Sequence, residues 1–365
     1  MTTTTLDVFG ARSGMRALSP WLRSRNWDLT FITFSVFTAA IPYFIYLLLG
    51  GTDTARLLIN LLVSLFVGGP HMYATFTRTV LDPDFVKRRP AFIASSLLIP
   101  TAVIFMAVSS YETYVWLLTL FFGLASLHAL QQIIWLAEAY NVKARVALSL
   151  PSRLIDYAVI LTSLYPIAVW KMVRGEFTIG EVTLKVSELL RGQTWIAYLV
   201  SAAFALSLIA FIVKTYLEYR AGYVNIPKLA LIGVTVVLMF ITPSFSNMDT
   251  AFQGINTWHS FQYLALTWYA NRLAEKKSGQ RRGLVQALFD RDTSGWWKFY
   301  LVCMAMLPIS GLLFLGANLI WPNLHAGKPG AAEVYGYIAI LSILLVHYYH
   351  DAFLFTEPEA LVAEV

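Results

Sequence analysis

The feature that most constrains this sequence is a series of apolar segments, each about as long as a membrane-spanning helix, which needs about 20 such residues. Of the 365 residues, 58% are hydrophobic and only 13% are charged, whereas a soluble domain averages roughly 25% charged residues. We therefore predict an all-α fold, a polytopic transmembrane bundle of about ten helices. The predicted segments are Leu29–Leu49, Ala55–Val80, Pro90–Ser109, Tyr111–Tyr140, Arg153–Met172, Thr194–Leu217, Pro227–Ser244, Asn247–Arg272, Trp297–Ile320 and Ala332–Phe355.

Lysine and arginine are distributed unevenly among the connections between these segments. If the N-terminus is cytoplasmic, 20 basic residues lie in cytoplasmic segments and 6 lie on the opposite side. Cytoplasmic loops of membrane proteins carry an excess of basic residues, so we predict that both termini face the cytoplasm, in the inner membrane of a bacterium. The same asymmetry accounts for the formal net charge of +6 without a nucleic-acid partner.

The chain is predicted to have three parts: a basic cytoplasmic arm at 1–28, the transmembrane bundle at 29–356 and a short C-terminal tail at 357–365. The arm has no unbroken apolar run and is therefore not a cleavable signal peptide. The largest outer loop alternates apolar and polar residues around Phe177–Ile179 and Val182–Val186, which predicts a small β-hairpin.

Polar residues recur inside four of the apolar segments, although polar groups at bilayer depth are costly and usually face the bundle interior or a site. His71 follows directly after a Gly-Gly-Pro break. In the other three segments the spacing places polar residues on one helix face: His128 with Gln131 and Gln132, His259 with Gln262 and Tyr263, and His347 with His350 and Asp351. At 1.5 Å per residue, the five histidines lie within roughly 6 Å of one depth. We predict that these helices converge in the cytoplasmic half of the membrane.

Imidazoles with a carboxylate and open positions suit non-haem iron, and also zinc, copper or manganese. The predicted metal ligands are His71, His128, His259, His347, His350 and Asp351, and the predicted catalytic neighbours are Gln131, Gln262 and Tyr263. We also expect Gln132 and Thr75 nearby, and Asp249 as a cap of the eighth helix. The pattern favours a membrane metalloenzyme, a non-haem iron or di-iron oxidoreductase that acts on a lipid or isoprenoid.

The expected partners are the lipid bilayer, a hydrophobic small-molecule substrate and a soluble electron donor, which could dock on the basic loop around Lys87, Arg88 and Arg89. Three alternatives stay open. Two histidines on facing helices could ligate haem, a transporter could use His and Asp as a proton relay, and the histidines could simply hydrogen-bond neighbouring helices.

Three short motifs carry a resemblance to a known class of proteins: Gly69-Pro70-His71, Trp258-His259-Ser260 and His347-Tyr348-Tyr349-His350-Asp351. They resemble motifs of histidine-rich bacterial membrane oxygenases, and the first two are similar to motifs of the carotene-cleaving membrane dioxygenases, which use iron. The His-Gly…Asp-His pattern of that family is absent, since Met72 follows His71, and the multi-histidine boxes of membrane desaturases are missing. The sequence looks closer to uncharacterised multi-pass proteins with a His-x-x-Gln helix and a terminal His-Tyr-x-x-Asp helix. The resemblance implies an iron-dependent oxygenase.

Overall fold

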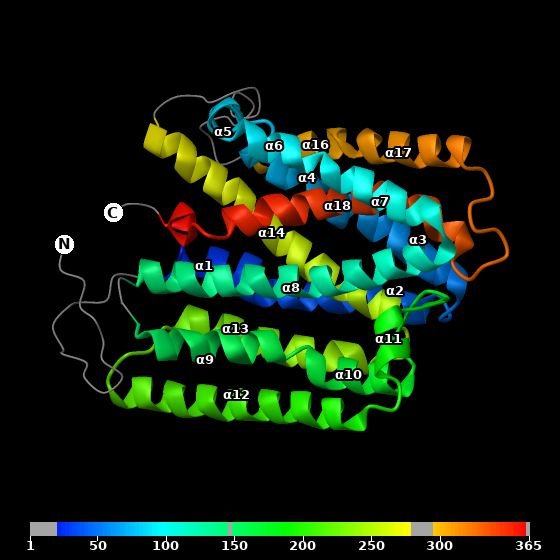
Figure 1. The fold of residues 1–365 in the computed structure, drawn as a ribbon. Coiled ribbons are helices and arrows are strands. Elements are labelled where there is room, and N and C mark those ends of the chain that lie inside the picture. Colours follow the sequence, from blue (N-terminus) through cyan, green and yellow to red (C-terminus); the bar gives the residue numbers. More distant parts are fainter. Residues whose placement is uncertain (1–19, 145–147, 279–294, 363–365) are drawn as a thin grey trace.

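The computed structural model describes residues 20–144, 148–278 and 295–362, and within them the regular structure is almost entirely helical. Nine helices of this described part are long and apolar enough to cross a membrane. Together with one further long helix, described below, they cross a single bundle in alternating directions (Figure 1). The prediction of an all-α polytopic bundle is therefore confirmed.

The first four spans contain most of the irregular helix. Their elements are α1 (Arg25–Asp28), η1 (Leu29–Thr33), η2 (Phe34–Ala39) and α2 (Ala40–Leu48); α3 (Asp53–Val63), η3 (Ser64–Gly68), α4 (Gly69–Ala74) and η4 (Thr75–Arg78); α6 (Pro90–Ser96) and α7 (Leu98–Ser109); and α8 (Tyr111–Lys143). The short helix α5 (Pro83–Arg88) lies between the second and third spans. Both η1 and η3 are π-helices, whereas η2 and η4 are 3₁₀-helices.

The remaining spans are more regular, although two of them are divided into two α-helices at a proline. They are α9 (Leu150–Thr162) with α10 (Tyr165–Arg174), α12 (Thr194–Arg220), α13 (Ile226–Ile241) with η5 (Thr242–Ser244), α16 (Trp296–Ala305) with α17 (Leu307–Ile320), and η7 (Ala331–Glu333) with α18 (Val334–Leu354). Pro166 and Pro308 stand in the first turns of α10 and α17. A proline lacks the N–H that would continue the preceding helix, so each span restarts there.

The eighth predicted segment corresponds to α14 (Met248–Ser278), the one predicted span that is not among the nine apolar candidates. It runs obliquely through the bundle from the end that carries α11 (Lys185–Leu190) to the end that carries α5 (Figure 1). Gly254 permits this close crossing, because a Cβ at that position would lie 2.3 Å from the carbonyl oxygen of Ala39. The polar side chains His259, Ser260 and Gln262 are buried in protein, so α14 does not need an apolar sequence to lie at membrane depth.

The predicted hairpin is confirmed in the connection that follows α10. Strand β1 (Thr178–Ile179) pairs antiparallel with β2 (Val182–Thr183), with Ile179 opposite Val182. The short helix α11 (Lys185–Leu190) follows it. We call this side of the molecule the hairpin end and the opposite side the α5 end.

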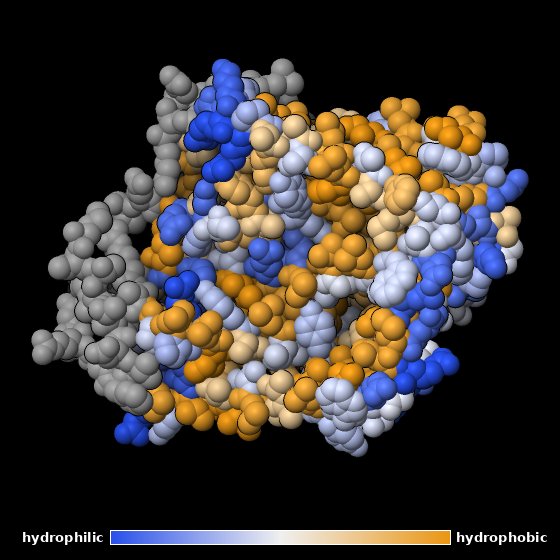
Figure 2. Space-filling view, viewed as in Figure 1, coloured by the Kyte–Doolittle hydropathy of each residue, from blue (hydrophilic) through white to orange (hydrophobic). Residues whose placement is uncertain are grey.

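The surface is consistent with a lipid environment. Apolar side chains cover much of the surface over α7 and α17 and over α9 and α12, whereas hydrophilic side chains gather over α5 and beside α11 (Figure 2). Among the candidate spans, the most apolar part of α16–α17 is the least buried. The most apolar parts of α12 and α6–α7 come next and are buried to the same extent. These helices therefore present their side chains outward, as membrane helices do.

The ends of the described chain pack on the bundle. Leu22 is buried, and the Asp28 carboxylate accepts hydrogen bonds from the backbone N–H groups of Leu22 and Arg23 and from the Tyr140 hydroxyl. In the predicted tail, η8 (Pro358–Leu361) buries Leu361. The first 19 residues of the predicted arm and the last 3 of the tail lie outside the described residues. Both α1 and η8 lie at the α5 end (Figure 1), as an even number of crossings requires.

Candidate metal centre

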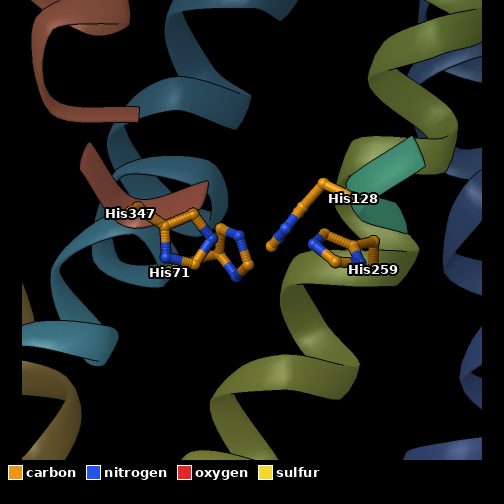
Figure 3. A group of neighbouring side chains, drawn as sticks. All are labelled: His71, His128, His259 and His347. Carbon is orange, nitrogen blue, oxygen red and sulfur yellow. The ribbon is translucent and has the colours of Figure 1, made fainter. Parts of the chain in front are cut away.

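Four histidines from four different helices meet in the interior of the bundle. They are His71 on α4, His128 on α8, His259 on α14 and His347 on α18, and all four are buried. One potential ligand atom from each lies within 4.8 Å of the others. The His71 ring is centred 4.8 Å from the His259 ring and 4.3 Å from the His347 ring. The four rings point toward one another (Figure 3), so this group could bind a metal ion.

The helix around His71 departs from α geometry directly before the histidine. The π-helix η3 ends at Gly68, and α4 begins with Gly69 and Pro70. A Cβ on Gly69 would lie 2.3 Å from the carbonyl oxygen of Ser64, so only glycine fits this backbone without rearrangement. Single π-helical turns within α-helices frequently occur at functional sites. Here the turn changes the direction in which the residues after it project, including His71.

Most nitrogen atoms of this cluster have no hydrogen-bond partner. Both ring nitrogens of His128 and His259, Nδ1 of His71 and Nε2 of His347 are buried and unpartnered. An unpaired buried polar atom costs roughly 1–3 kcal/mol, and native proteins rarely keep several together. Neutral imidazole nitrogens are common ligands of transition metals, so a bound ion would supply the partner that these atoms lack.

A hydrogen-bonded group on one side of the cluster holds Asp351 in place. The Tyr263 hydroxyl donates to Asp351 Oδ1 at 2.6 Å, and Thr75 Oγ1 contacts the same oxygen. The Thr75 hydroxyl also lies 2.9 Å from His347 Nδ1. The other oxygen, Oδ2, has no hydrogen bond and lies 3.6 Å from Nε2 of His347 and 3.8 Å from Nε2 of His128. Asp351 therefore faces the same space as the four histidines.

The glutamines occupy two different environments. Gln132 is buried and donates to Gln262 Oε1 at 2.6 Å, and Gln262 donates in turn to the Ile32 carbonyl oxygen at 2.9 Å. This chain ties α8 and α14 to the π-helix of the first span, beside the histidines. Gln131, which we predicted to be a catalytic residue, is only half-buried. The structure brings Gln262 and Tyr263 to the centre and places Gln132, rather than Gln131, in the hydrogen-bonded network.

Two further predicted residues lie away from the four histidines. His350 is one turn beyond His347, with Nδ1 2.9 Å from the Thr79 hydroxyl and its ring against Phe76 and Phe92. Asp249 accepts hydrogen bonds from Arg56 and Asn60 near the hairpin end. At the start of α14, the Thr250 N–H donates a hydrogen bond to Asn247 Oδ1 and not to Asp249. Asp249 therefore forms an ion pair and does not serve as the expected cap.

Two aromatic residues that were not among the predicted site residues complete the wall of the cluster. Tyr348 stacks on the His128 ring with ring centroids 4.2 Å apart, and Phe355 also stacks on the His128 ring, at 5.6 Å. Trp135 then packs on Phe355 at 5.0 Å. The adjacency of Tyr348 to His347 in the sequence was the one available signal, but a residue directly after a histidine normally points to a different helix face.

Comparisons with protein-family models, with curated proteins and with solved structures find no match to this chain. The geometry of the site is therefore the basis for assigning a function.

Proposed function

We propose that this protein is a membrane oxidoreductase in which His71, His128, His259 and His347 hold a non-haem metal ion, iron in preference to other metals. The observation that carries this proposal is the convergence of four buried imidazoles whose ring nitrogens are largely unpartnered. Its substrate is a hydrophobic small molecule that reaches the centre from within the bilayer, and its oxidant is dioxygen.

The number and type of the ligands support iron over zinc. A structural zinc site is closed by four protein ligands, whereas a catalytic zinc normally keeps one of its four positions for water. Four imidazoles would therefore close a zinc site. Non-haem iron centres keep open positions beside their protein ligands, so the same four residues leave room for a substrate or oxygen on iron. Manganese favours oxygen ligands, and none of the four is a carboxylate.

The neighbours of the four histidines have roles that their contacts suggest. Asp351 places a negative charge beside the His128 and His347 nitrogens, which offsets the positive charge of the ion. Thr75 and Tyr263 orient that carboxylate through Oδ1. Such groups behind the ligands commonly change metal affinity by 10–100-fold when they are removed. When bound, the metal would supply the one-electron chemistry that protein side chains lack.

A haem is supported less well by the same cluster. Haem iron takes its equatorial nitrogens from the porphyrin and needs at most two axial residues from the protein. Four imidazoles that approach one another within 4.8 Å occupy the space in which a macrocycle would have to lie.

Metal analysis of the detergent-purified protein tests the proposal. We expect at least one equivalent of iron in the wild type and less than a tenth of that in His259→Ala, because the alanine removes one of four converging ligands. His325→Ala is the matched control, since His325 lies near the hairpin end and contacts the Ala107 carbonyl oxygen. X-ray absorption at the iron edge then reports whether nitrogen ligands surround the ion and whether a second iron is present.

Either of two results would reject the proposal. One is a wild-type protein that contains no metal after expression in iron-supplemented medium. The other is equal metal content in His259→Ala and His325→Ala, which would place any bound ion elsewhere. A Soret band in the purified wild type would instead support the haem alternative.

A further inference from the structure

A cavity of about 260 Å³ lies between the metal centre and the hairpin end, with walls from α3, α8, α14, α17 and α18. A second cavity of about 320 Å³ lies beyond Phe122 and Phe252, which line both. The second has a mostly apolar lining of α8, α10 and α14 residues. Only the first, which we call the Asn60 cavity, combines apolar walls with a set of polar groups and a wall residue that touches the histidines.

The Asn60 cavity reaches the metal centre through two of its lining residues. Tyr348 forms part of its wall and stacks on His128. Asn256 also lines it, one helical turn before His259 on α14. Gln253, which accepts a hydrogen bond from Asn256, also lines this part, and the other neighbours include the apolar Phe121, Leu341 and Leu344. A molecule in the cavity would therefore lie along an apolar surface that ends beside the four imidazoles.

The polar groups at the other side of this cavity define what kind of end group it accepts. The Asn60 amide nitrogen donates to Asp249 Oδ2 at 2.9 Å. This hydrogen bond directs the amide oxygen of Asn60, Oδ1, away from the Asp249 carboxylate. Oδ1 is buried and has no hydrogen-bond partner. The two carboxylates in the lining, Asp249 and Glu333, are held by Arg56 at 2.8 and 2.9 Å. This end thus holds an unpartnered acceptor beside two carboxylates and one guanidinium, a group with a net negative charge, which suits a neutral donor and disfavours an anion.

We propose that the Asn60 cavity binds a long-chain alcohol, of acyl or isoprenoid type, with its hydroxyl donated to Asn60 Oδ1 and its chain directed past Tyr348 toward the histidines. This inference rests on the proposed function, because it names the substrate class of that centre. Asn60 and His71 are 11 residues apart on nearly continuous helix, so roughly 16 Å separate them along the helix axis at 1.5 Å per residue. The chain is therefore presented to the metal far from its hydroxyl.

Photolabelling with four diazirine probes tests the proposal: a C16 alcohol, the matching acid, the matching alkane and an isoprenoid alcohol. We expect an alcohol to label residues of the Asn60 cavity, and the acid to label them at least tenfold less. The more efficient of the two alcohols identifies the type of chain. Equal labelling of this cavity by alcohol, acid and alkane, or labelling confined to the lipid-facing helices α12 and α16, would overturn the proposal.

Gly336→Leu closes the cavity without disturbing the backbone. Gly336 lines the cavity, and a Cβ added there meets no atom within 4 Å, so the new side chain starts in open space. We expect alcohol labelling to fall at least tenfold. Gly233→Leu on α13 is the matched control, since its Cβ is equally unobstructed and it does not line the cavity. Undiminished labelling in Gly336→Leu would contradict the assignment.

Asn60→Leu tests the end group alone. It should reduce labelling by the alcohol roughly three- to tenfold, the equivalent of one hydrogen bond, and leave labelling by the alkane unchanged. Iron content measured in the same samples separates the two proposals. Iron-loaded protein without cavity labelling rejects the alcohol site only, whereas cavity labelling of protein that never binds metal rejects the oxidoreductase.

Discussion

The four histidines and a second buried polar group, which surrounds Asp156, differ in how their hydrogen-bonding atoms are satisfied. Asp156 on α9 accepts from Lys214 of α12 and from Lys228 of α13, the latter at 3.0 Å. Lys214 also lies 3.6 Å from Glu218. Each charge in this group therefore faces an opposite charge. In the histidine cluster, by contrast, six ring nitrogens and one carboxylate oxygen are buried without a partner.

The contrast separates polar residues that hold helices together from those that could bind a ligand. Buried charges persist in proteins when they are paired and hydrogen-bonded, and the Asp156 group meets that condition with atoms of the chain alone. The histidine cluster does not. Arg56, which pairs with Asp249 and Glu333 and so links α3, α14 and η7, belongs with the Asp156 group. The concentration of unpartnered atoms, and not the presence of polar atoms as such, distinguishes the candidate metal centre.

The largest effect on folding is expected from Asp156→Asn, which would leave two buried ammonium groups without their shared carboxylate. Removing one partner of a buried ion pair typically costs about 3–5 kcal/mol. Unfolding in detergent, followed by circular dichroism, should show a loss of this size. The folded fraction should keep any bound metal, because the side-chain partners of Asp156 are Lys214 and Lys228 and not the histidines. Loss of iron before unfolding would mean that the two groups are coupled.

A smaller effect is expected from Tyr263→Phe, which keeps the ring beside His71 and removes the hydroxyl that donates to Asp351. The carboxylate then loses one of the groups that orient it, and iron affinity should fall about 10–100-fold. Competition with a chelator of known affinity measures the change. Tyr348→Phe is the control, because it preserves the ring that stacks on His128. Equal affinities in both variants would show that Asp351 does not influence the ion.

The smallest effect should distinguish the two adjacent glutamines of α8. Gln132→Leu leaves Gln262 Oε1 buried without its donor and should destabilise the protein by about 1–2 kcal/mol. Gln131→Leu alters a half-buried position, where substitutions usually change stability by no more than about 0.5 kcal/mol. Thermal unfolding of the two variants side by side provides the measurement. A larger loss of stability in Gln131→Leu than in Gln132→Leu would instead assign Gln131 to the hydrogen-bonded network.

Much of the candidate site was predictable because depth along a helix follows directly from residue number. Counting residues from the helix ends placed His71, His128, His259 and His347 in one layer, and these four do converge. His350 is at nearly the same depth but faces Thr79 and Phe92 instead. Depth therefore identifies candidates, whereas the rotation of each helix about its own axis decides which of them meet.

The sequence by itself determined the approximate number, the length and the apolar character of the helices, because hydrophobic runs act locally along the chain. It also determined the hairpin, through alternation in a short loop. Only the tertiary structure decided that α14 crosses the bundle obliquely, that Gln132 and not Gln131 joins the network, and that Asn60 Oδ1 stays unpartnered in a cavity. Those features depend on helix crossing and rotation, which arise from packing between segments far apart in the chain.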